Sequence, residues 1–354
     1  MSSQPAGGTP VASPRPEPDT EPATAKPGAE GAEGTAGAEG AEGTAESEGA
    51  AEPTVRAASP AGSVGGAIVL AVLSYVWLGL LVFSALATLG APGDGVLGIT
   101  ETAYGLPAVI FAALIAGAGL AQAVRRAADR WLGSAPVARF AAMLGCGAST
   151  GAGAAAVVVL GDGRGGSAVA ILGWVLFTGA TVGGSIVGVH RRAGLLTGAT
   201  VAAALTVSVL TTARELLKGP LLDLFGAGDT PASVLAAQSR VTWITALLAG
   251  VAAGVVAFGY LHVALRRARQ TLLWPAYLLA GAGTGIMLLV SELVTRIGGA
   301  QLLNLARSFS ESDDAFQTMA NAARINSALV ILFAGAFTAL ICLGRALPAR
   351  TAAD

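Results

Sequence analysis

Apolar residues of this chain gather in long uncharged stretches, which charged residues separate at regular places. A helix of about 20 residues crosses the ~30 Å apolar core of a bilayer, and its backbone satisfies its own hydrogen bonds inside lipid. The pattern therefore predicts an all-α, polytopic membrane protein with about eight transmembrane helices. The eight stretches are Val64–Leu89, Thr102–Val124, Phe140–Gly161, Gly165–Val189, Ala193–Ala213, Val241–Leu261, Gln270–Ser291 and Ile325–Gly344.

The composition excludes a single soluble globule. Only 12% of the residues are charged and 53% are apolar, whereas a soluble domain averages about 25% charged residues. A secreted disulfide scaffold is excluded as well, because Cys146 and Cys342 are the two cysteines of the chain.

The first 62 residues have a different composition. They hold ten acidic and three basic residues, a net charge of −7, and no aromatic residue. Such a segment buries too little apolar surface to offset its chain entropy, so we predict a disordered acidic tail over 1–62 and a helical transmembrane domain over 63–354. The tail is either an interaction segment for a protein partner or a passive solvated extension.

Basic residues in the connecting loops predict the orientation. Twelve of them are Arg56, the two arginines after the last stretch, and those in the loops after the second, fourth and sixth stretches, against seven in the other loops. By the positive-inside rule the richer side is cytoplasmic. We therefore expect a protein of the cell (inner) membrane, built as four hairpins with both termini in the cytoplasm.

Two of these hairpins resemble each other in the order of their features. In 193–269 a small-residue stretch leads to Arg214, then to Leu221–Leu224 and Arg240. In 270–350 a similar stretch leads to Arg296, then to Leu302–Leu305 and Arg324. Arg240 and Arg324 are each predicted to open the apolar helix that follows. Both copies run in the same direction, which predicts parallel repeats. The alternative is chance similarity in a composition rich in Ala, Leu and Gly.

Ionisable residues near the predicted outer ends of these hairpins are the candidates for chemistry, because such residues are costly at membrane depth. Glu292 and Arg296 lie four residues apart and meet on one helical face. Arginine suits bidentate capture of carboxylate or phosphate. An anion or lipid-headgroup site is one interpretation; the other is arginines that reach the headgroups while a glutamate neutralises a neighbour. The candidate binding residues are Arg214, Glu215, Arg240, Glu292, Arg296 and Arg324.

Two common enzyme signatures are missing from the sequence. It contains neither a GxxxxGK[ST] nor an HExxH motif. We therefore lean against an enzyme and expect no cofactor, no metal site and no nucleic-acid partner.

The function we favour from sequence is a transporter or channel-like protein for a small solute or lipid headgroup. The alternative is a non-transporting scaffold or assembly partner in the cell envelope, which docks a protein through its tail or its outer loops; a membrane-embedded enzyme is third. Small-xxx-small faces, such as Gly250 with Gly254, predict close packing of hairpins or an oligomer.

Overall fold

The computed structural model describes residues 64–89, 95–128, 135–162, 166–189, 193–269, 272–301, 304 and 311–346. All of them belong to one compact unit, Arg56–Asp354. The predicted disordered tail, 1–62, lies outside the described residues. The helices are α1 (Val64–Leu89), α2 (Gly95–Ala128), α3 (Pro136–Asp162), α4 (Ser167–Gly188), α5 (Ala193–Leu216), α6 (Lys218–Leu224), α7 (Pro231–Ala268), α8 (Trp274–Gly298) and α10 (Glu311–Ala346).

The all-α fold predicted from the apolar stretches is confirmed. Eight of these helices are long and apolar enough to cross a membrane, one for each predicted stretch. The described part of the chain contains no strand. The protein is thus an integral membrane protein with eight candidate spans, and α6 is a short additional helix with no buried residue.

Two helices begin well before the arginines that were expected to open them. Arg240 and Arg324 were predicted to start their helices, but α7 begins at Pro231 and α10 at Glu311. At the start of α7 the side chain of Thr230 accepts a hydrogen bond from the backbone N–H of Ser233, which caps the helix. That prediction was wrong because arginine is a good helix former. It interrupts an apolar stretch, but the helix continues through it.

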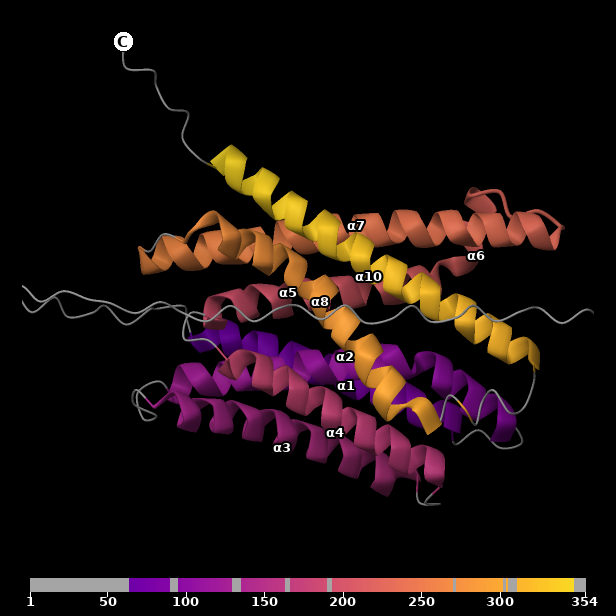
Figure 1. The fold of residues 1–354 in the computed structure, drawn as a ribbon, viewed down its shortest axis with the longest axis horizontal. Helices are drawn as coiled ribbons and strands as arrows, with labels where there is room; N and C mark the ends of the chain where they lie inside the picture. The colour runs from indigo at the N-terminus through magenta and orange to yellow at the C-terminus, as the bar shows by residue number, and fades with distance from the viewer. Residues whose placement is uncertain are drawn as a thin grey trace, which may run out of the picture. The chain divides into compact units, whose positions relative to one another are not determined.

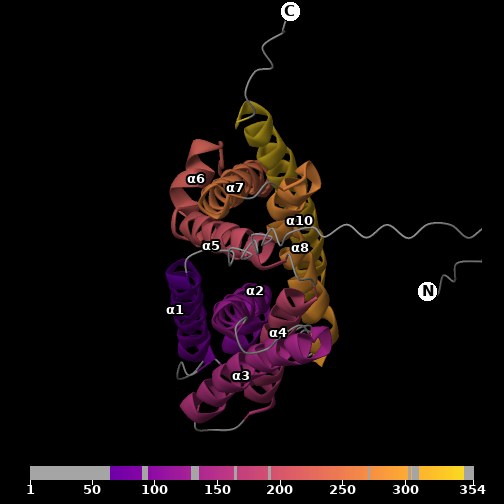
Figure 2. The ribbon, with the colours of Figure 1, turned by 90° about the vertical axis from the view of Figure 1, so that its left-hand side faces the viewer.

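The helices pack as two groups that α2 and α8 join (Figure 1). In the first group α2 contacts α1, α3 and α4, and 78% of its apolar window is buried. In the second, α7 and α10 pack on each other, while α8 contacts both of them and α5. Figure 2 shows α2, α5 and α8 next to one another between the groups, and each pair of these three is in contact.

Small residues allow the close approach of these helices. A Cβ atom on Gly183 of α4 would lie 2.1 Å from the backbone oxygen of Leu114 in α2. In the second group a Cβ on Gly285 of α8 would lie 2.5 Å from the Cα atom of Leu332 in α10. Gly254 likewise meets α10 of the same chain. These faces serve packing within the chain, and the oligomer predicted through such faces stays a prediction.

The two predicted repeat copies contain helices in the same order. A span, α5 or α8, is followed by a connecting segment and then by a long helix, α7 or α10. In Figure 1, α5 and α8 run in the same direction, and α7 and α10 return in the opposite one. The repeat over 193–269 and 270–350 remains a prediction that this order supports.

Candidate functional site

Glu292 is a carboxylate buried in a membrane-spanning helix. It lies in α8, six residues before the end of that helix, and is 6% exposed. Its neighbours Ser291 and Thr295 are also buried, and their hydroxyls donate to backbone oxygens of α8 itself. A buried charge needs partners, and those of Glu292 come from elsewhere.

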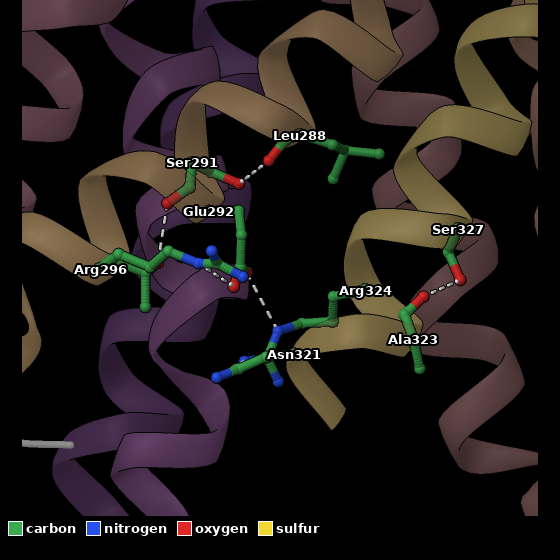
Figure 3. Close-up of polar contacts among 9 residues, drawn as sticks. Leu288, Ser291, Glu292, Arg296, Asn321, Ala323, Arg324 and Ser327 are labelled. Atoms are coloured by element: carbon green, nitrogen blue, oxygen red, sulfur yellow. Dashed lines mark hydrogen bonds and ion pairs between the residues drawn. The ribbon is translucent and has the colours of Figure 1, made fainter. Parts of the chain in front are cut away.

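Two arginines supply these partners (Figure 3). Arg296, one helical turn further along α8, donates from Nε to Oε1 of Glu292 over 3.4 Å. Arg324 of α10 donates from Nε to Oε2 over 3.1 Å. Each carboxylate oxygen therefore has its own guanidinium, and the second ion pair ties α8 to α10. We call these three side chains the Glu292 cluster.

The Glu292 cluster has a net charge of +1, and its two arginines are partly exposed. The side chains of Arg296 and Arg324 are 50% and 31% exposed, whereas that of Glu292 is 8% exposed. Arg324 is further held by Asn321, whose side-chain oxygen accepts from its guanidinium. Guanidinium N–H groups thus remain available to an anion that arrives from the exposed side.

The other three predicted site residues lie apart from the Glu292 cluster. Arg214 pairs with its neighbour Glu215 at the end of α5, with 3.1 Å between Nε and Oε1. Arg240 is exposed on α7 and forms no ion pair with any residue that the structure describes. Arg214 and Arg296 lie in the last turns of α5 and α8, but among the four arginines the structure joins only Arg296 and Arg324 through a shared carboxylate.

A shallow cavity of about 340 Å³ lies near the end of α8, between this helix and α4. Its lining is largely apolar, and it includes Ile297 and Gly298, which directly follow Arg296. Within the described ranges, no group of three or more His, Cys, Asp or Glu side chains is placed to hold a metal ion. The cavity is lined by Ala170, Ile171, Trp174, Ile297, Gly298 and Gln301.

A second polar cluster, at the opposite end of the bundle, was missed by sequence reasoning. Gln122 of α2 is 1% exposed, and its Nε2 donates to the backbone oxygen of Gly194 in α5 and to the hydroxyl of Tyr260 in α7, over 3.1 and 3.4 Å. Arg126 donates to the same hydroxyl over 3.1 Å. A Cβ on Gly198 would lie 2.5 Å from that hydroxyl, so glycine at this position of α5 makes the contact possible. We call Gln122, Arg126 and Tyr260 the Tyr260 cluster.

The sequence held only a faint signal for the Tyr260 cluster. Gln122 is the single glutamine of its uncharged stretch, Thr102–Val124, and glutamine carries no charge that would mark it. Tyr260 lies near a helix end, where tyrosine is typical of the membrane interface. Their partnership joins residues 138 positions apart, which no helical periodicity indicates.

Comparisons with known proteins leave the function to the geometry. The sequence matches no protein-family model and no curated protein, and the fold matches no solved structure.

Proposed function

We propose that this protein is a transporter or channel-like protein that handles a small anionic solute or an anionic lipid headgroup, and that the Glu292 cluster is its recognition site. The observation that carries the proposal is one buried carboxylate shared by two partly exposed arginines on two helices. Ionisable groups at membrane depth are costly and generally mark function. Two guanidiniums around one carboxylate leave a net positive charge for an incoming anion.

The proposed recognition step is an exchange of carboxylates or phosphates on Arg324. An anion that enters from the exposed side accepts hydrogen bonds from Arg296 and Arg324 in place of Glu292. The ion pair between Glu292 and Arg324 is the polar tie between α8 and α10 at this point, so its exchange loosens these two helices. Binding is thereby coupled to a movement at one end of the bundle.

The proposal includes a location and an orientation. The arginine distribution favours the cell (inner) membrane with both termini in the cytoplasm, which puts the Glu292 cluster on the outer side. The apolar lining of the cavity between α4 and α8 suits an acyl chain, and this supports a lipid as the source of the anionic group. The acidic tail over 1–62 remains available for a protein partner.

A non-transporting scaffold is the second candidate, and the packing of the second helix group favours it. A Cβ on Gly281 of α8 would lie 2.3 Å from the backbone oxygen of Gly335 in α10, and Gly285 is as tightly packed against Leu332. Helices in such backbone contact leave no room for a solute between them. In the transport proposal a solute therefore has to pass elsewhere in the bundle.

A thermal-shift screen of the protein in liposomes tests the proposal. Chloride, phosphate, glutamate and glycerol phosphate are each added to wild type, to R324Q and to R240Q, and the melting temperature Tm is recorded. Arg240 is the matched control, because it is an exposed arginine in a long helix. We expect at least one anion to raise Tm of wild type and R240Q but not of R324Q; a ligand at 100 times its Kd stabilises by about 2.7 kcal/mol.

Flux of the stabilising anion separates the two candidates. Vesicles that contain wild-type protein are expected to exchange the labelled anion, and R324Q vesicles are expected to lose the exchange while the protein stays folded. Binding without exchange in wild type favours the scaffold. A screen in which no anion shifts Tm of wild type, or in which R324Q responds like wild type, refutes the role of the Glu292 cluster.

A further inference from the structure

Three buried polar atoms within the described residues have no hydrogen-bond partner: Oε1 of Gln122, Oγ of Ser208 and Oγ1 of Thr284. Their residues are 1%, 4% and 0% exposed. Inside a membrane no lipid group replaces a missing partner, and an unsatisfied polar group there costs free energy. A ligand that donates and accepts hydrogen bonds removes this cost at all three positions.

The hydroxyls of Ser208 and Thr284 differ from other serine and threonine hydroxyls on the same helices. Serine and threonine in helices ordinarily bond back to a backbone oxygen three or four residues earlier. Thr200 of α5 does so to Leu196 over 3.0 Å, and Ser291 of α8 does so to Leu288 over 2.7 Å. Ser208 and Thr284 keep their oxygens away from their own backbone, and each oxygen therefore needs a partner outside its helix.

The three positions fall on the three helices that meet between the two helix groups. Gln122 is in α2, Ser208 in α5 and Thr284 in α8, and these helices contact one another pairwise (Figure 2). We call this junction the α2–α5–α8 seam. It is separate from the tightly packed contact of α8 with α10.

The three positions also follow one another along the bundle axis. α5 and α8 run in the same direction (Figure 1). A Cβ on Gly283 of α8 would lie 2.4 Å from Oγ1 of Thr200 in α5, so these two residues are at the same level along the bundle axis. Thr284 is therefore level with Thr200, and Ser208 lies about 12 Å further on, at 1.5 Å per residue. Gln122 bonds Gly194, six residues before Thr200, or about 9 Å in the other direction.

We propose that the α2–α5–α8 seam binds a file of water molecules, which runs from the Tyr260 cluster to the level of Ser291, next to Glu292. Water is the ligand because it is small, neutral, and supplies both donors and acceptors to an amide oxygen and two hydroxyls. This inference rests on the proposed function in one respect: the water file is a route for a solute or proton only if the protein is a transporter or channel. The water file itself stands on the three unpartnered atoms.

Hydroxyl-radical labelling of the full chain in liposomes tests the water file. X-ray pulses convert bound water into radicals that oxidise adjacent methionines, and mass spectrometry follows each one. The chain provides its own standards: Met287, one turn from Thr284, is 2% exposed, Met143 on α3 is 0% exposed, and Met319 is 69% exposed. We expect Met287 to be oxidised at a rate close to that of Met319, and Met143 to stay protected.

Two isosteric variants make the test specific. T284V removes the unpartnered hydroxyl, and T295V removes a hydroxyl that already bonds the backbone oxygen of Ser291. Loss of one hydrogen bond to water lowers its occupancy by about fivefold, so oxidation of Met287 falls by about that factor in T284V and is unchanged in T295V. Oxidation of Met287 as slow as that of Met143 in wild type overturns the inference, and so does an equal rate in T284V and wild type.

The labelling and the anion screen fail independently. Protected Met287 together with anion stabilisation that depends on Arg324 overturns the water file and leaves the Glu292 cluster as the recognition site. Oxidised Met287 without any anion effect overturns the recognition site and leaves a hydrated seam.

Discussion

The ion pairs of Glu292 predict a stability loss that a neighbouring glutamate does not share. E292Q keeps the shape of the side chain and removes its charge, so Arg296 and Arg324 lose a common counter-ion. E215Q makes the same chemical change at Glu215, which is 55% exposed and pairs with the adjacent Arg214. The two carboxylates differ in burial, and only Glu292 connects two helices, because Glu215 and Arg214 both belong to α5.

The expected magnitude follows from the exposure of the partners. Removing one member of a fully buried ion pair costs about 3–5 kcal/mol. Here the stranded arginines are 50% and 31% exposed, and water screens them. We therefore expect about 1–3 kcal/mol for E292Q, against about 0–1 kcal/mol for the exposed pair in E215Q.

Thermal unfolding in detergent, followed by tryptophan fluorescence, measures the difference. At about 2–4 °C per kcal/mol, E292Q lowers Tm by roughly 2–12 °C and E215Q by at most about 4 °C. The double variant E292Q/R324Q adds a direct check, because removing both partners costs less than the sum of the single changes if they interact. Equal shifts for E292Q and E215Q, or additive effects in the double variant, refute the reasoning from the shared carboxylate.

Two further predictions concern helix packing. G183A places a methyl group against the backbone oxygen of Leu114 and is expected to destabilise the protein by about 1–3 kcal/mol. Its control is G153A, whose Cβ has nothing within 4 Å, so that this variant is neutral or gains up to about 1 kcal/mol from helix propensity. A Tm comparison in which both variants behave alike contradicts the close approach of α4 to α2. Y260F removes the acceptor of two hydrogen bonds and is expected to cost about 1–3 kcal/mol. Its control, Y75F, removes one interhelical bond and costs about 1 kcal/mol; a Y260F protein as stable as wild type would show that the Tyr260 cluster does not tie its helices together.

The spans were predictable because a bilayer imposes a length and a polarity on each one. Eight uncharged stretches gave eight helices at the expected positions. The ends were less predictable where a helix continues beyond the membrane. Arg240 lies inside α7 and Arg324 inside α10, because the signal for a helix end is a capping residue such as Thr230 rather than a charge.

The sequence by itself determined the contacts that helical periodicity controls. Glu292 and Arg296 are four residues apart, and one helical turn brings them together wherever the helix lies. The tertiary structure alone decided which distant residues join them. Arg324 reaches Glu292 across 32 positions, and Gln122 meets Tyr260 across 138. Such pairs depend on which helices become neighbours. Gly281 and Gly285 let α8 approach α10, and Gly198 of α5 leaves space for Gln122 and Tyr260 to meet. These fits are properties of surfaces rather than of sequence spacing.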